Sequence, residues 1–396
     1  MRAEIPAKHR PRLLGLFAHP DDETFCAGGT LAKYVAAGAE AMVVSFTRGE
    51  AGQIRDTDVA TRRTLGEVRA AEMQAACELL GVQHVECLDF GDGQLARLDP
   101  QLITAEAVEI IRTFRPDVVL TAGEDGAYAH PDHQVLRQAV SEACLLAGAA
   151  ENFPEQIDAG LEPHAPPRLY YSHFARTRTL KIREVVRWLK GLDKAFRSAP
   201  DFAQAFLLFS QETAALRFNS SLIDIGWYPP GFHIAEQGET AEAFHLILSG
   251  RLTVKTEDGE GRLVPTGELG PGDFFGDPGV PHPAHVIAAE STTCLVLWCG
   301  EVEPRAMPKP EGKKVRAVDC PAGVGDGATT RVDCSAQVAQ KVAAMAAYRS
   351  QYPFKPDIFP ASMLQEMFGS EYFVRVLPDR QWETEVLPEL DQPNAS

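Results

Sequence analysis

The stretch RLLGLFAHPDDETFCAGG, residues 12–29, joins a short apolar run to a turn that carries one histidine and three acids. Residues 12–18 have the length and apolar character of a buried strand, and the residues from Gly28 onward predict a helix. Carboxylates this close repel each other and raise each other's pKa unless a positive charge lies among them. The stretch therefore predicts a strand, a turn and a helix, with a turn that favours a bound cation.

The same alternation of strand and helix patterns continues through the first 175 residues. A β-α-β-α order is typical of the α/β class, in which a mostly parallel sheet carries helices on both faces. The further strands are expected at 40–47, 84–90, 117–123 and 168–174, and the further helices at 61–82, 102–115 and 132–148.

Polar clusters follow four of these strands, at the point where each strand ends. Open α/β sheets build their sites outside the carboxyl ends of the strands, so we expect these remote segments to meet at one edge of the sheet. The clusters are HPDDE at 19–23, TRGEAGQ at 47–53, GDGQL at 91–95 and GEDGAYAHPDH at 123–133.

The length, net charge and cysteine content of the chain indicate its number of domains, its partners and its compartment. The chain has 396 residues, more than one hydrophobic core usually serves, so two domains are expected. Its net charge of −17 disfavours nucleic acid and anionic membranes as partners. We expect neither a signal peptide nor a membrane span. Eight cysteines without a C-x-x-C pair predict free thiols in a reducing cytosol, hence a cytoplasmic protein.

The pattern changes after residue 176. Residues 180–217 predict helices, and residues 222–299 consist of short apolar runs separated by glycines, which is typical of an antiparallel β-barrel or jelly roll. A linker at 303–314 and a helix at 335–351 follow, and the acidic tail from 379 lacks a packing pattern and is expected to be loose. We expect a first α/β segment at 1–180, an inserted unit at 181–302, and a linker with a second α/β segment at 303–396.

The two HPD units indicate a metal site. His19, an aspartate of the same turn and His133 provide two imidazoles and one carboxylate, a set typical of catalytic zinc with one position open for water. The alternative is that Asp21 and Asp22 only cap the next helix. A second HPD unit at another strand end favours the metal, but the residues alone do not choose between the two aspartates.

At this point the motifs resemble a known family. AHPDDE, TRGEAG, GDGQL and YAHPDH resemble the LmbE-like, or PIG-L-type, metal-dependent N-deacetylases. The resemblance covers about 12–175 and resumes at 329–351 and 368–378. It implies a Rossmann-like fold and hydrolysis of an N-acetyl group, typically on a glucosaminyl conjugate.

The resemblance also implies roles for the residues of the first HPD turn and its partner. By this similarity His19, Asp22 and His133 are the zinc ligands, and Asp21 is the general base. The expected cofactor is Zn²⁺, with another divalent ion such as Fe²⁺ left open.

Further roles come from the same resemblance. His130 is expected to stabilise the oxyanion or to protonate the leaving amine, with Asp132 orienting it, and Tyr128 is expected to reach the substrate carbonyl. The residues expected to contact the sugar are Glu50, Arg69 and Asp92.

Three of these positions have alternatives. Arg69 lies in a predicted helix and can belong to a solvated face, and Asp92 between two glycines can be an ordinary turn residue. Tyr348 departs from the family, because many relatives have histidine there, so the resemblance assigns it no role.

The inserted unit has a resemblance of its own. Residues 205–300 resemble a cyclic-nucleotide-binding domain, with Phe275 and Gly276 opening the phosphate cassette. Asp277 stands where that family has its ribose-binding glutamate, Pro278 has no N–H, and His282 replaces the expected arginine. We expect that this unit does not bind cyclic AMP or cyclic GMP with useful affinity.

Together these features predict a zinc-dependent hydrolase that removes the acetyl group from an N-acetylglucosaminyl-type small molecule. Two alternatives stay open. One is an amidase for a different amide, such as a thiol-sugar conjugate, and the other is a sensor that works through the inserted unit.

Overall fold

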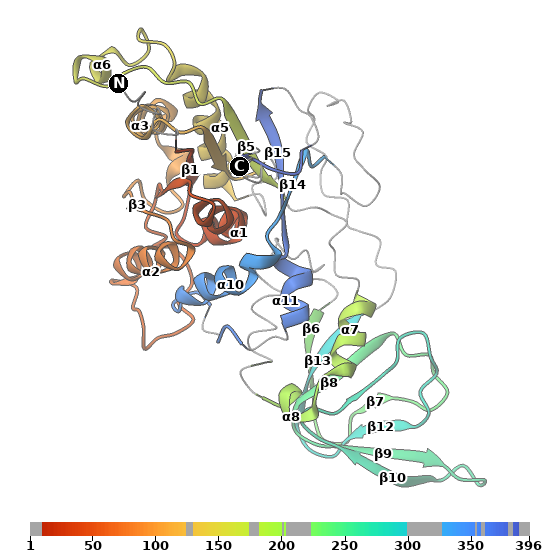
Figure 1. Ribbon diagram of the computed structural model, residues 1–396. Helices are drawn as coiled ribbons and strands as arrows, with labels where there is room; N and C mark the ends of the chain where they lie inside the picture. The colour runs from red at the N-terminus through yellow and green to blue at the C-terminus, as the bar shows by residue number, and fades with distance from the viewer. Residues whose placement is uncertain are drawn as a thin grey trace, which may run out of the picture. The chain divides into compact units, whose positions relative to one another are not determined.

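The computed structural model describes residues 10–123, 130–173, 182–199, 202, 223–298, 327–352, 355–357, 361–378 and 383–387. Contacts divide the chain into two compact units (Figure 1). The first unit combines 1–177 with 316–396, and the second unit, 178–315, interrupts it in the sequence.

The first unit is built on a seven-stranded sheet with the order β14-β15-β5-β4-β1-β2-β3. The strands from β3 to β5 in this order pair in parallel, whereas β15 is antiparallel to β5 and β14 is antiparallel to β15. The predicted mostly parallel α/β fold is thereby confirmed. The strands are β1 Arg12–Phe17, β2 Glu40–Ser45, β3 His84–Cys87, β4 Val118–Thr121, β5 Arg168–His173, β14 Thr330–Asp333 and β15 Ser370–Leu377.

Helices cover both faces of this sheet. Leu14 and Leu16 of β1 pack with α3 and α5 in one core cluster, while α1, α2 and α10 pack against one another. In Figure 1 α3 and α5 are separated from α2 and α10 by the strands. The helices are α1 Asp22–Ala36, α2 Leu65–Leu80, α3 Pro100–Phe114, α5 Pro131–Leu146, α6 Pro154–Asp158, α10 Val338–Ala347 and α11 Ala361–Phe368, with short 3₁₀ turns η1 Leu95–Arg97 and η4 Ser335–Gln337.

Buried polar contacts fasten the second α/β segment to α1, the helix that follows the HPDDE turn. Glu371 accepts hydrogen bonds from the N–H groups of Gly29 and Thr30, both at 2.8 Å. Lys341 pairs with Glu371 at 2.6 Å and donates to the Phe25 carbonyl at 3.0 Å. A Cβ at Gly29 would lie 2.7 Å from the Cβ of Cys334, so this close approach requires glycine.

The expectation of a loose C-terminal tail is wrong for residues 383–387. Val386 and Leu387 are fully buried, and the Val386 N–H donates to the Tyr34 hydroxyl at 2.9 Å. Lys33 pairs with Glu385 at 2.7 Å. A segment this short has no periodicity, so its pattern does not indicate that it docks.

The second unit is antiparallel β structure preceded by two helices, which confirms the predicted inserted all-β fold. Its two four-stranded sheets have the orders β10-β9-β12-β7 and β11-β8-β13-β6. Ala243 and Ile247 of β8 share a core cluster with Val286 of β12, so the sheets pack face to face. The elements are α7 Ile182–Gly191, α8 Lys194–Arg197, β6 Ile223–Tyr228, β7 His233–Ala235, β8 Ala243–Ser249, β9 Leu252–Glu257, β10 Leu263–Leu269, β11 Phe274–Phe275, β12 His285–Ala288 and β13 Thr292–Trp298.

Across the described parts of both units, every helix is too short or too polar to cross a lipid bilayer.

Candidate functional site

The polar loops converge at the carboxyl ends of the parallel strands, as the topology predicts. His19 follows β1, and Asp22 begins α1. His133 lies in the first turn of α5, and Asp92 lies in the loop after β3. Together with Asp132, these side chains are close enough to form direct contacts, although they come from three separate loops.

The three predicted ligands form a small buried triangle. His19 Nδ1 lies 3.0 Å from His133 Nε2, and Asp22 Oδ2 lies 3.0 Å from His133 Nε2 and 3.6 Å from His19 Nδ1. Donor atoms bound about 2.0–2.2 Å from a tetrahedral zinc ion are spaced about 3.3–3.6 Å apart. One of the three spacings lies in this range and two are shorter by about 0.3 Å, so the triangle is close to the size that one small divalent ion needs. His130 also lies close enough to His19 and His133 to take part in such a site.

Electrostatics at the triangle favour positive charge. Burial raises the pKa of Asp22, but the contacts with His133 and His19 hold that pKa well below its usual range. Burial lowers the pKa of His19, yet Asp132, Asp22 and Asp92 raise it well above its usual value. A concentration of carboxylates around buried imidazoles is the setting in which a cation is bound.

The other ring nitrogen of His19 faces two carboxylates. Nε2 lies 3.0 Å from Asp92 Oδ1 and 3.4 Å from Asp132 Oδ2. Asp92 Oδ2 also accepts from the Ala51 N–H at 2.9 Å, and Asp132 Oδ2 accepts from the Gly93 N–H at 2.7 Å. A histidine ligand normally donates its second N–H to such a carboxylate, which fixes the ring orientation. The sequence did not indicate this contact for either aspartate.

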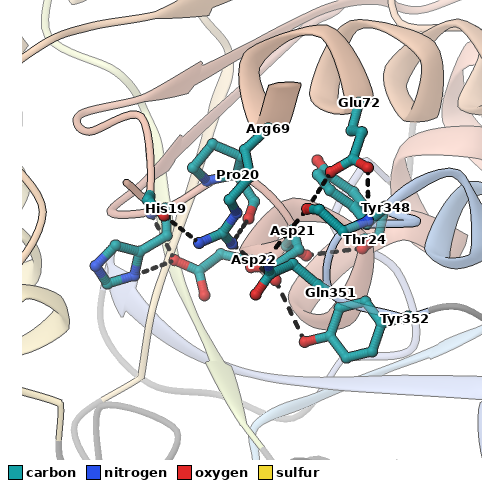
Figure 2. A network of polar contacts seen from close by, with 12 residues as sticks. His19, Pro20, Asp21, Asp22, Thr24, Arg69, Glu72, Tyr348, Gln351 and Tyr352 are labelled. Carbon is teal, nitrogen blue, oxygen red and sulfur yellow. Dashed lines mark hydrogen bonds and ion pairs between the residues drawn. The ribbon is translucent and has the colours of Figure 1, made fainter. Parts of the chain in front are cut away.

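Asp21 and Asp22 point to different partners, which the sequence could not decide. Asp21 Oδ2 accepts from Arg69 Nη2 at 3.0 Å and from the Tyr352 hydroxyl at 3.2 Å (Figure 2). Burial raises the pKa of Asp21 to about 6, although Arg69 opposes the shift. A carboxylate with this pKa can accept a proton near neutral pH.

Glu23, the third acid of the turn, points into the protein. Its Oε2 accepts from the Asp21 N–H at 3.0 Å, and its Oε1 accepts from the Tyr348 hydroxyl at 2.5 Å. Burial raises the pKa of Glu23 to about 8. Glu23 belongs to the HPDDE motif, but neither the motif nor the resemblance assigned a role to Glu23 or to Tyr352.

His130 lies against both histidines of the triangle. Its ring centroid is 4.7 Å from that of His19 and 5.2 Å from that of His133. Its Nδ1 accepts from the Asp132 N–H at 3.2 Å, which caps α5, while burial lowers the pKa of His130. The role of Asp132 in orienting His130 stays a prediction, and Tyr128 lies outside the described residues.

Two of the predicted sugar contacts are already engaged with the protein. Arg69 is buried and donates to the Gly49 and Pro20 carbonyls as well as to Asp21, so the alternative of a solvated face is wrong. Glu50 Oε1 accepts from the Asp92 N–H at 2.8 Å. Within the described residues, Glu50 Oε2 and Asp132 Oδ1 are buried oxygens without a hydrogen-bond donor.

In the second unit, the loop that corresponds to the phosphate cassette forms an ion pair and hydrogen bonds with other residues of the same unit. Lys190 of α7 forms an ion pair with Asp277 at 2.8 Å. The N–H groups of Gly279 and His282 donate to the carbonyls of Ala241 and Glu239 at 2.9 and 2.8 Å. These amides are therefore not available to a phosphate without breaking those bonds.

Comparison with known proteins gives matches to both units. A family model described as GlcNAc-PI de-N-acetylase (PIG-L) matches residues 14–144, and one described as cyclic nucleotide-binding domain matches residues 226–298. The chain is 36% identical over 272 residues to a mycothiol S-conjugate amidase of Streptomyces coelicolor, an alignment that covers 60% of this chain and 92% of that relative.

A second relative and a solved structure are also similar. The 1D-myo-inositol 2-acetamido-2-deoxy-alpha-D-glucopyranoside deacetylase of Rhodococcus opacus is 37% identical over 182 residues, which covers 41% of this chain and 61% of that relative. The solved N,N'-diacetylchitobiose deacetylase of Pyrococcus horikoshii is 24% identical with a TM-score of 0.38, and the match covers 44% of this chain and 65% of that chain.

Proposed function

The chain belongs to the PIG-L (GlcNAc-PI de-N-acetylase) family of hydrolytic N-deacetylases, and we propose that it removes the acetyl group from an N-acetylglucosaminyl small molecule with zinc as its metal. The observation that carries the proposal is the buried triangle of His19, Asp22 and His133 with Asp21 beside it. Two imidazoles with one carboxylate and an open position are typical of catalytic zinc.

The metal and the chain have separate tasks in this proposal. A bound zinc ion supplies Lewis acidity, which polarises an amide carbonyl and lowers the pKa of a water ligand to about 7. His19, Asp22 and His133 hold that ion, and Asp92 and Asp132 hold the His19 ring.

Asp21 is the proposed base. Arg69 and Tyr352 both donate to its Oδ2, so Oδ1 is the oxygen that can accept the proton of the attacking water. With its pKa at about 6, Asp21 is mostly ionised at neutral pH and can still hold a proton transiently.

His130 is proposed to act on the other side of the reaction. Its Nδ1 accepts from the Asp132 N–H, so in this proposal the donated proton is carried by Nε2. From there it can donate to the oxyanion or to the leaving nitrogen, so that acetate and a free amine are released.

Two buried acceptor oxygens support a hydroxyl-rich substrate. Glu50 Oε2 and Asp132 Oδ1 are buried and lack a donor among the described residues, and a hydroxyl-rich ligand supplies such donors. Arg69 is engaged with Asp21 and two carbonyls, so we place it with the base rather than with the sugar.

A second candidate is cleavage of a different amide, that of a thiol-sugar conjugate. The observation in its favour is the relative named as a mycothiol S-conjugate amidase, which is matched over 92% of its length.

The two candidates are separated by supplying the zinc-loaded full chain with 1D-myo-inositol 2-acetamido-2-deoxy-alpha-D-glucopyranoside (GlcNAc-inositol) and with a mycothiol S-conjugate. Release of acetate from the first supports the deacetylase, and release of a free amine from the second supports the amidase. Asp21→Asn is the control, because it keeps the metal ligands and removes the base, so its kcat should fall on the order of 10²–10⁴-fold. If neither compound is cleaved, or if Asp21→Asn retains normal kcat, the proposal is wrong.

A further inference from the structure

Asp21 has an unusual backbone as well as an unusual environment. Its φ of 105° lies in the left-handed region, which is uncommon for residues other than glycine. Such a conformation persists only where the surrounding contacts hold it in place, and it is concentrated at functional sites. The contacts that hold Asp21 therefore show which residues determine where its carboxylate lies.

One set of contacts acts on the backbone of Asp21. The Asp21 N–H donates to Glu23 Oε2 at 3.0 Å, and the Asp21 carbonyl accepts from the Thr24 N–H at 3.0 Å. The carboxylate of Glu23 has a second contact, because the Tyr348 hydroxyl donates to its other oxygen, Oε1, at 2.5 Å. Glu23 and Tyr348 are both fully buried, so solvent does not replace either contact.

A second set of contacts acts on the side chain. Arg69 and the Tyr352 hydroxyl converge on the same oxygen, Oδ2, at 3.0 and 3.2 Å. Figure 2 shows Asp21 between these two side chains. Because one oxygen takes both donors, the direction of the other oxygen is set.

The two tyrosines come from one anchored segment. Residues 348–352 follow α10, beyond the inserted unit in the sequence, and the Tyr352 N–H donates to the Tyr348 carbonyl at 2.6 Å. Ser350 is fixed to Glu72 of α2 by its N–H at 2.7 Å and its hydroxyl at 2.6 Å. Gln351 donates to the Gln53 carbonyl at 2.8 Å. The segment is thus held to α2 and to the loop after β2 by several hydrogen bonds.

From these contacts we propose that Tyr348 and Tyr352 are positioning residues for the base. Tyr348 holds the backbone of Asp21 through Glu23, and Tyr352 holds its carboxylate together with Arg69. This inference rests on the proposed function, because it takes Asp21 as the group that accepts the water proton. The segment after the inserted unit therefore completes the catalytic site, although it is far from the HPDDE turn in the sequence.

The test uses the zinc-loaded full chain with GlcNAc-inositol as the substrate. Tyr348→Phe and Tyr352→Phe remove one hydroxyl each and keep the ring. Each is expected to lower kcat roughly 10- to 100-fold, because a small displacement of a reacting group costs about that much. KM and zinc content are expected to stay unchanged. Tyr170→Phe is the matched control, since this buried tyrosine donates to Glu383 at 2.8 Å, away from Asp21.

A double-mutant cycle distinguishes positioning from general stability. If Tyr352 acts through Asp21, then Tyr352→Phe changes kcat less than about 2-fold once Asp21→Asn is present. Equal losses in both backgrounds, an effect on KM alone, or a loss of zinc overturns the inference. If Asp21→Asn by itself leaves kcat unchanged, the proposed function fails together with this inference. If Asp21→Asn lowers kcat and the cycle is additive, only the positioning role fails.

Discussion

Asp92 is the residue at which the family resemblance and the geometry lead to different roles. The resemblance places it on the sugar, whereas its carboxylate lies 3.0 Å from His19 Nε2 with its side chain only 9% exposed. Asp92→Asn separates the two roles, because it keeps the shape of the side chain and removes the charge.

The expected effect can be worked out from the two contacts of this carboxylate. Asp92 accepts from His19 through Oδ1 and from the Ala51 N–H through Oδ2. Asparagine has only one acceptor oxygen, so one of these donors loses its partner. A hydrogen bond to a charged group contributes about 1.5–3 kcal/mol, against about 0.5–1.5 kcal/mol for a neutral one. Asp132, at 3.4 Å, continues to hold the ring. We therefore expect zinc to bind about 10- to 100-fold more weakly.

The assay is a zinc titration of the metal-free full chain against a competing chelator that changes colour. Asp89→Asn is the matched control, because Asp89 is in the same loop, is 71% exposed and lies near Arg48 rather than near a histidine. The melting temperature of the metal-free Asp92→Asn protein checks that the variant is folded.

A normal zinc dissociation constant for Asp92→Asn, combined with a raised KM for GlcNAc-inositol, would refute this reasoning. Asp92 would then be the sugar contact that the resemblance implies. Weaker zinc binding with a KM that is normal at saturating zinc supports the role in holding His19.

The remaining predictions concern the metal ligands and the second unit. His133→Ala is expected to lose metal and activity together, and full zinc occupancy by elemental analysis would contradict its role as a ligand. Calorimetry on the full chain is expected to detect no binding of cyclic AMP or cyclic GMP at low micromolar concentration. The reason is that Asp277 forms an ion pair with Lys190 and that the N–H groups of the cassette loop are hydrogen-bonded within the unit. Saturable binding in that range would contradict this expectation. Burial lowers the pKa of His245 to about 4, so the unfolded chain binds a proton at higher pH than the folded chain does. The free energy of unfolding is therefore unaffected by His245 above about pH 6.5. It falls by roughly 3 kcal/mol as the pH falls toward 4, because the unfolded chain gains a proton there that the folded chain does not. His245→Gln should flatten this dependence in acid unfolding monitored by circular dichroism, and an unchanged pH dependence would exclude His245 as its source.

Local patterns in the sequence were enough for the fold class and for the expectation that His19 and His133 lie at one edge of the sheet. The periodicity of a strand or a helix depends only on neighbouring residues, so the sequence showed the alternation of strands and helices through residue 173. That alternation predicted the edge of the sheet at which His19 and His133 meet. The glycine-separated runs after residue 222 indicated the all-β unit for the same reason.

The family resemblance assigned different roles to Asp21 and Asp22, but only the tertiary structure shows which partners the three acids contact. Asp21, Asp22 and Glu23 are adjacent and chemically alike, so no spacing argument distinguishes them. In the folded chain Asp21 contacts Arg69, Asp22 contacts His133, and Glu23 accepts from the Asp21 N–H.

The partners of these acids come from remote parts of the chain, and no local pattern connects them to the turn. Tyr348 and Tyr352 reach the turn because β15 pairs with β5 and α10 packs on α1 and α2, which brings the segment after α10 behind Asp21. The same pairing buries Glu371 against α1. Sequence periodicity records which face of an element is apolar, whereas the contact between two remote side chains depends on the register and packing of whole elements, and that is why the support of Asp21 became visible only in the folded chain.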